Sequence, residues 1–158
     1  MNKEDMKKLL NLSSDKYGDG KDLRPGIRIL LIDCSDAEIG SIRYEIEKGR
    51  EFKVVGIAKD VHKAREMVKS LKPDLVIMDI MDPRSGGIGF LKRLQHFHPI
   101  PVMLISPVSR MPFRMVVSAF KLGATRIIDK ESLDIFRKNG SPSKGLSFFE
   151  HIKLAASA

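Results

Sequence analysis

The chain has 158 residues, of which 42% are hydrophobic, and its formal net charge is +8. This length and apolar content suit one folded domain and exclude global disorder. No apolar run approaches membrane-spanning length, and residues 1–12 lack the apolar region of a signal peptide. A single cysteine excludes an intrachain disulfide framework and a cysteine-rich zinc site. We therefore expect a cytoplasmic protein with no membrane association.

The positive charge has two interpretations. It could attract an anionic partner, or it could be a solvated surface. The basic residues are scattered among acids, no basic run is interleaved with aromatics, and the chain has no Trp. This pattern favours the solvated surface and predicts no nucleic-acid partner.

The chain divides by composition into an extension and a domain. Residues 1–25 contain a short apolar stripe (Met6, Leu9 and Leu10) and a polar, turn-forming segment at 13–20. We expect an N-terminal extension and linker at 1–25 and a single domain at 26–157.

From residue 27 the sequence alternates strand and helix patterns. Apolar runs predict strands at 27–32, 52–58, 75–78, 102–105 and 126–128. Between and after them, apolar stripes at helical spacing predict five helices, of which the first begins near Ser35 or Asp36 and the fourth is closed by Gly123. Alternation of this kind predicts an α/β fold, in which a doubly wound, five-stranded parallel sheet has helices on both faces.

Four polar residues directly follow predicted strands: Asp33, Asp79, Ser106 and Lys130. In one parallel sheet these strand ends share an edge, where open α/β sheets place their chemistry. Carboxylates can bind a divalent cation, and one carboxylate can attack phosphorus while a hydroxyl and an ammonium bind the phosphoryl oxygens. Each residue alone could equally be a helix cap or a surface lysine. Their ordered recurrence favours a shared site.

The same residues make the sequence resemble a known family, the receiver domain of two-component response regulators. The resemblance covers roughly residues 24–156 and implies the flavodoxin-like receiver topology. Within the family the sequence looks most like the receiver of the chemotaxis methylesterase, through the Ser106 segment and the tail KESLDI at 130–135. The stretches that carry the resemblance are ILLIDCS at 29–35, PDLVIMDIMDP at 73–83, PVMLIS at 101–106 and GATRIIDK at 123–130.

The resemblance implies a role for each matching position. Asp79 corresponds to the phosphoacceptor, and Asp33 to one of the paired acids that bind Mg²⁺. Met81 would offer its backbone carbonyl to the metal. Ser106 matches the hydroxyl that contacts the phosphoryl group, and Lys130 matches the lysine that pairs with the phosphoryl oxygens.

The sequence departs from the family at the metal ligands. The family has two adjacent acids after the first strand, whereas here Asp33 is followed by Cys34. Magnesium prefers oxygen to a thiol, so we expect weakened metal binding and a structural role for Cys34 as a small buried residue. The spacing of Asp36 is wrong for it to compensate.

Three further departures concern the phosphoryl contacts and the switch. Pro107 follows Ser106 where the family donates a backbone N–H, and proline has none. Glu131 follows Lys130 where the family has a proline after a cis bond, which is costly before other residues. Ile127 occupies the place of the switch aromatic and cannot swing a ring.

We interpret the chain as a stand-alone receiver in a phosphorelay. It would take a phosphoryl group from a histidine kinase or phosphotransfer protein and contact an output protein; a homodimer is left open. The resemblance implies no enzyme beyond self-phosphorylation, and we find no methylesterase domain. The alternative is a degenerate receiver that binds a partner without phosphorylation. A phosphatase or mutase using Asp79 as nucleophile would need an acid–base carboxylate, for which Asp82 is the nearby candidate.

Overall fold

The computed structural model describes residues 26–32, 35–80, 86–133 and 145–158. The expected extension at 1–25 lies outside these residues, so its separation from the domain stays a prediction. The elements, in chain order, are β1 (Ile27–Ile32), α2 (Asp36–Lys48), β2 (Phe52–Ala58), α3 (Val61–Leu71), β3 (Leu75–Met78), α4 (Gly87–Phe97), β4 (Val102–Ser106), η1 (Val108–Arg110), α5 (Phe113–Lys121), β5 (Ala124–Asp129), η2 (Lys130–Ser132) and α6 (Phe148–Ala156).

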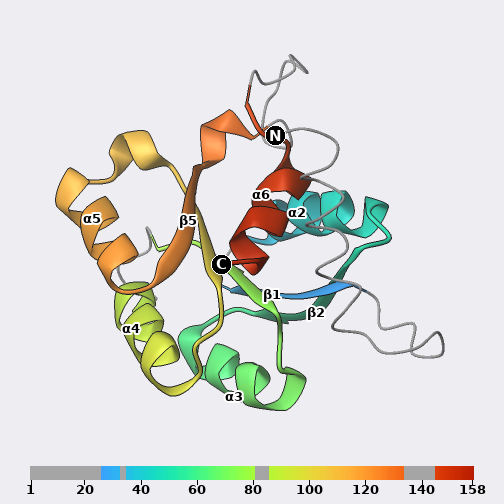
Figure 1. Ribbon diagram of the computed structural model, residues 1–158, viewed down its shortest axis with the longest axis horizontal. Coiled ribbons are helices and arrows are strands. Elements are labelled where there is room, and N and C mark those ends of the chain that lie inside the picture. The colour runs from blue at the N-terminus through green and yellow to red at the C-terminus, as the bar shows by residue number, and fades with distance from the viewer. Residues whose placement is uncertain (1–25, 33–34, 81–85, 134–144) are drawn as a thin grey trace.

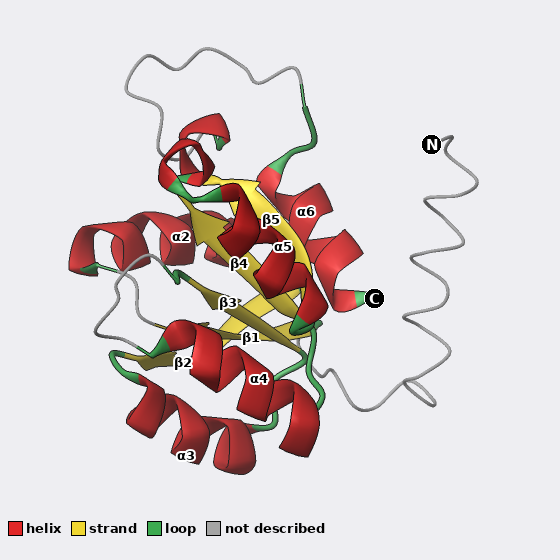
Figure 2. Cartoon of the chain, turned by 90° about the vertical axis from the view of Figure 1, so that its left-hand side faces the viewer, coloured by secondary structure: helices red, strands yellow, loops and turns green. Residues whose placement is uncertain are grey.

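The five strands form one parallel sheet in the order β2-β1-β3-β4-β5. Helices α2 and α6 cover one face of the sheet, and α3, α4 and α5 cover the other (Figures 1 and 2). The predicted doubly wound, flavodoxin-like fold is therefore confirmed. Because the chain reverses direction across the sheet between β1 and β3, the carboxyl ends of these strands flank the position where such folds place ligands.

The apolar side chains of each strand divide between two cores. In β1, Leu30 and Ile32 pack under α3 and α4, whereas Ile29 and Leu31 pack under α2 and α6. All four residues of β3 are fully buried. Because successive side chains of a strand enter the two apolar cores in turn, each buried strand appears in the sequence as an unbroken apolar run.

The structure corrects the expectation for the ends of β4, β5 and α5. β4 extends through Ser106 and β5 through Asp129, because these two residues pair across the sheet. The C-cap of α5 is Leu122, and Gly123 follows it at φ 109°, where its N–H donates to the carbonyl of Phe120. The glycine thus lies one residue beyond the expected position, in the left-handed conformation that glycine favours.

The apolar residues of α5 are less buried than their spacing implies. Ala119 is its one fully buried residue, whereas Phe113 is 82% exposed. Val116 packs only partly against the core. Periodicity identified the helix but could not reveal that the core contact falls on a small residue, because a period gives no absolute orientation.

A polar contact joins β5 to α6. Arg126 Nε donates a hydrogen bond to His151 Nδ1 at 3.2 Å. The Nη2 atom of the same guanidinium lies 3.0 Å from that ring nitrogen. Burial, and then the charge of Arg126, lower the pKa of His151 below its ordinary value, although the Glu150 carboxylate acts in the opposite sense. The imidazole is therefore favoured as the neutral acceptor.

We predict that this contact makes folding stability depend on pH. The unfolded chain protonates His151 at a higher pH than the folded chain, so the contribution is full above about pH 6.5 and is lost as the pH falls through the lowered pKa. Urea unfolding at about pH 7.5 and about pH 5.5 should show a larger loss of stability for the natural protein than for His151→Gln. Equal losses in the two proteins would contradict this assignment.

Candidate functional site

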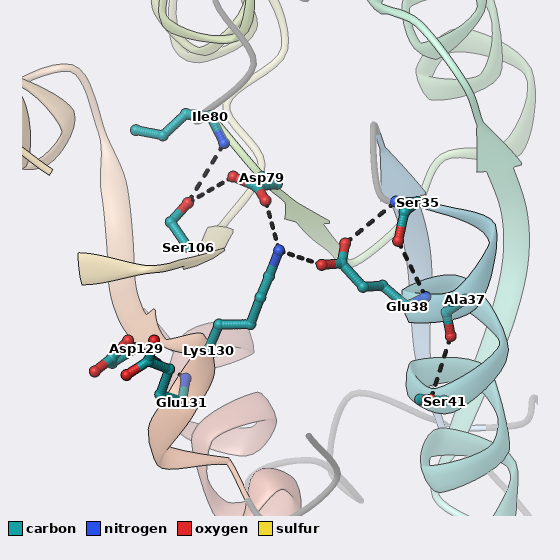
Figure 3. Close-up of polar contacts among 10 residues, drawn as sticks. All are labelled: Ser35, Ala37, Glu38, Ser41, Asp79, Ile80, Ser106, Asp129, Lys130 and Glu131. Atoms are coloured by element: carbon teal, nitrogen blue, oxygen red, sulfur yellow. Dashed lines mark hydrogen bonds and ion pairs between the residues drawn. The ribbon is translucent and has the colours of Figure 1, made fainter. Parts of the chain in front are cut away.

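Three of the four predicted strand-end residues meet at the carboxyl edge of the sheet. Asp79 directly follows β3, Ser106 ends β4, and Lys130 begins η2 directly after β5. Figure 3 shows the Ser106 and Lys130 side chains reaching the Asp79 carboxylate from either side. The parallel sheet causes this meeting, because β3, β4 and β5 are neighbours and end together.

The two oxygens of Asp79 have different partners. Ser106 Oγ donates to Oδ1 at 2.8 Å, and Lys130 Nζ donates to Oδ2 at 2.8 Å. Ser106 is fully buried, and its Oγ lies 3.5 Å from the backbone nitrogen of Ile80. The carboxylate is thus fixed by a hydroxyl at the end of β4 and an ammonium from the residue that follows β5.

A second carboxylate, Glu38, completes the cluster and was missed in the sequence. Its side chain forms an ion pair with Lys130, whose ammonium therefore lies between Glu38 and Asp79 (Figure 3). Glu38 lies in the first turn of α2 and forms a capping box with Ser35, whose N–H donates to Glu38 Oε2 at 3.2 Å. The Ser-x-x-Glu spacing could have been recognised as a capping box, but it does not reveal a second partner 92 residues away.

The two carboxylates stabilise the charged form of Lys130. Burial alone would lower the pKa of the Lys130 ammonium, but its hydrogen bonds to Asp79 and Glu38 outweigh burial and raise the pKa above its ordinary value. Lys130 is therefore a permanent cation at neutral pH. The cluster of these three groups carries one net negative charge, which leaves it able to accept a further cation.

The remaining predicted site residues are not all placed. Asp33, Cys34 and Met81, as well as Asp82, lie outside the described residues. Asp36 is exposed on α2, and its carboxylate lies 3.5 Å from Lys59 Nζ rather than at the cluster. No group of three or more metal-ligating side chains occurs within the parts of the chain that the structure describes.

The loop after β4 offers few amide donors to a ligand. Pro107 has no N–H, and the N–H of Val108 donates to Asp129 Oδ1 at 3.3 Å. Ile127 is half-buried and packs against the core beneath α3, α4 and α5. Among the described residues no peptide bond is cis, including the one between Lys130 and Glu131.

A parallel α/β domain with a lysine, a hydroxyl and carboxylates at its switch-point edge defines the class of the protein. The family model described as "Response regulator receiver domain" matches residues 29–135. The chain therefore belongs to the response regulator receiver family of two-component signalling.

The similar proteins place it near chemotaxis receivers. A protein-glutamate methylesterase/protein-glutamine glutaminase of Hydrogenovibrio crunogenus is 35% identical over 109 residues, which are 69% of this chain and 29% of the relative. One from Saccharophagus degradans is 38% identical over 66% of this chain and 30% of the relative. The response regulator domain of Thermotoga maritima CheB superposes with a TM-score of 0.67 at 29% identity, covering 84% of this chain and 98% of that domain. The chain thus spans less than a third of the length of these two curated relatives.

We predict that Lys130 stabilises the fold as well as the site. Lys130→Met leaves two carboxylates facing each other at the sheet edge, and we expect the free energy of unfolding at neutral pH to fall by about 2 kcal/mol. Lys48→Met removes a lysine from an exposed pair with Glu45, where solvent screens the charges, and should leave it nearly unchanged. Adding Glu38→Gln to Lys130→Met should recover part of the loss in urea unfolding. No loss in Lys130→Met would show that the ion pairs are energetically neutral.

Proposed function

We propose that Asp79 accepts a phosphoryl group and that this chain acts as a receiver in a phosphorelay. The observation that carries the proposal is the pair of contacts on its carboxylate, one from the buried Ser106 hydroxyl and one from the Lys130 ammonium. A hydroxyl and a fixed cation beside a carboxylate are the groups that bind phosphoryl oxygens as they gain charge.

The transfer itself is a displacement at phosphorus. A carboxylate oxygen of Asp79 forms the new P–O bond, and the bond from phosphorus to the donor's nitrogen or oxygen breaks. The leaving group keeps the electron pair and takes a proton from solvent. Lys130 and Ser106 can each turn from the carboxylate oxygens they now hold toward the phosphoryl oxygens, since both already lie within hydrogen-bond distance of the reacting group.

The oxygen atoms at the site are of the kind that Mg²⁺ binds, but the described residues do not form a complete magnesium site by themselves. Asp79 supplies a carboxylate of the kind that Mg²⁺ prefers, and the family resemblance adds Asp33 and the Met81 carbonyl. Bound there, the ion would supply positive charge to the phosphoryl oxygens. Cys34 supplies a thiol where the family has a second acid, and a thiol is a poor ligand for Mg²⁺, which supports weak metal binding.

A phosphorylation-independent binding module is the second candidate. Its support is the loop after Ser106, where Pro107 lacks an N–H and the Val108 N–H is engaged by Asp129. A site with fewer phosphoryl donors and a poor metal ligand would keep the fold while losing the chemistry. The structure adds no support for a phosphatase or mutase, because Asp82, the candidate acid–base carboxylate, lies outside the described residues.

The stand-alone role of the chain, its partners and its location in the cell stay predictions. A stand-alone role is proposed from the sequence, whereas the curated relatives carry the matching region within longer chains. The esterase and glutaminase activities in their names belong to those proteins, and we do not extend them to this chain. In the described residues no helix is long and apolar enough to cross a membrane. A histidine kinase or phosphotransfer protein as donor, an output protein and a cytoplasmic location are proposals on the same footing.

Phosphorylation of Asp79 is directly testable. Incubation with acetyl phosphate and magnesium should add the mass of one phosphoryl group, seen by intact mass spectrometry, and peptide mapping should place it on Asp79. Asp79→Asn should remain unlabelled, and Asp74→Asn, an acid on the opposite edge that caps the Arg28 amide, should label normally. Label retained in Asp79→Asn would end the assignment, and an unlabelled natural protein would favour the binding module.

Metal affinity tests the role of Cys34. Replacing Cys34 by Asp restores an oxygen ligand, so calorimetric titration should show tighter Mg²⁺ binding, by an amount on the order of 1 to 3 kcal/mol. Cys34→Ser supplies a hydroxyl without a charge and serves as the control. Equal affinities for Cys34→Asp and the natural protein would show that Cys34 does not limit metal binding.

A further inference from the structure

A groove runs between α3 and α4, away from the site at Asp79. It is made of two adjoining hollows of about 360 and about 420 Å³ that share Val68, Lys69, Phe97 and His98. Val68, Phe90 and Leu94 form an apolar floor. Helices α3 and α4 lie side by side on one face of the sheet in both Figure 1 and Figure 2.

The groove presents an exposed aromatic ring beside positively charged side chains from both helices. Phe97, in the last turn of α4, is 68% exposed and lines both hollows. Arg65 and Lys69, four residues apart on one face of α3, and Lys72, the C-cap residue that follows this helix, form a basic row along the groove. The two hollows adjoin through residues from both helices, so the groove extends along α3 and α4 rather than forming one compact pocket.

The charge along the groove is not compensated. Helices α3 and α4 carry five basic residues (Lys63, Arg65, Lys69, Lys92 and Arg93) and one acid, Glu66, which pairs with Lys63. In contrast, α2 on the other face of the sheet has four acids and two bases. Among the described residues Arg65, Lys69 and Arg93 form no ion pair or side-chain hydrogen bond. Among these three described helices, positive charge therefore gathers on α3 and α4 and negative charge on α2.

We propose that this groove docks an acidic amphipathic helix of a partner protein. Such a helix presents apolar residues with a repeat of three to four positions, which matches the floor and Phe97, and its carboxylates would face the basic row. The elongated shape favours a peptide segment over a small molecule. An apolar floor between the rims favours a protein segment over nucleic acid, whose backbone offers charge without apolar side chains.

The groove is separate from phosphoryl chemistry. Its second hollow is lined by Lys72 and Pro73, which precede β3, and by Pro99 and Ile100, which precede β4. These residues lie at the amino ends of the strands, whereas Asp79 lies at the carboxyl ends. Docking therefore leaves Asp79 uncovered, and the inference stands whether or not Asp79 is phosphorylated.

The test uses a designed probe and matched variants of the full chain. The probe is a fluorescein-labelled helical peptide with Leu and Phe at positions i, i+3, i+4 and i+7 and Glu elsewhere; a second peptide has Lys in place of each Glu. We expect fluorescence anisotropy to show binding of the acidic peptide alone. Phe97→Ser and Lys69→Glu should each weaken it by about tenfold, the loss expected for an anchor residue. Phe113→Ser and Lys121→Glu alter an exposed phenylalanine and an exposed lysine on α5, away from the groove, and should change the affinity less than about twofold.

Several outcomes would overturn the proposal. They are no binding of the acidic peptide, equal binding of the lysine peptide, equal weakening by Phe113→Ser, or full displacement of the peptide by a single-stranded oligonucleotide. Asp79→Asn should bind the peptide as the natural protein does, so a failed phosphorylation test and a failed docking test are distinguishable.

Discussion

The site depends on one ion-pair arrangement, in which the Lys130 ammonium lies between the carboxylates of Asp79 and Glu38. Two carboxylates at one edge of the sheet repel each other, and the cation between them offsets that repulsion. Asp79 directly follows β3, Lys130 lies in η2 and Glu38 in α2, so these ion pairs join segments that are far apart in the sequence. In the proposed phosphoryl transfer, the same cation would already be fixed beside the accepting carboxylate.

The first turn of α2 contributes to this arrangement through its cap. Ser35 and Glu38 satisfy each other's backbone amides, which holds the Glu38 carboxylate close to the sheet edge. A residue that would otherwise only begin a helix thereby places a charge in the site. Glu38 thus places a second carboxylate, beside that of Asp79, in contact with Lys130.

Much of this could be predicted from sequence because the signals were local. The unbroken apolar run before Asp79 identified a buried strand, and the parallel topology then required Asp79, Ser106 and Lys130 to share an edge. Glu38 could not be predicted, since its contact with Lys130 depends on how α2 lies across the sheet. The same limit applies to α5, where the sequence revealed a helix but not that Phe113 faces solvent. Nor did composition show that the basic charge gathers on α3 and α4, because that requires knowing which helices share a face.

The central claim is that Asp79, Ser106 and Lys130 act together on a phosphoryl group. Beryllofluoride with magnesium mimics that group, and amide chemical shifts report where the protein responds. We predict local shifts at Ser106 and Lys130 in the natural protein and none in Asp79→Asn. Through the rest of the segment from Met111 to Lys130 we predict only small changes, because Ile127 and Pro107 cannot make the usual switch contacts. An absence of shifts at saturating magnesium and beryllofluoride, or an identical response in Asp79→Asn, would contradict the account.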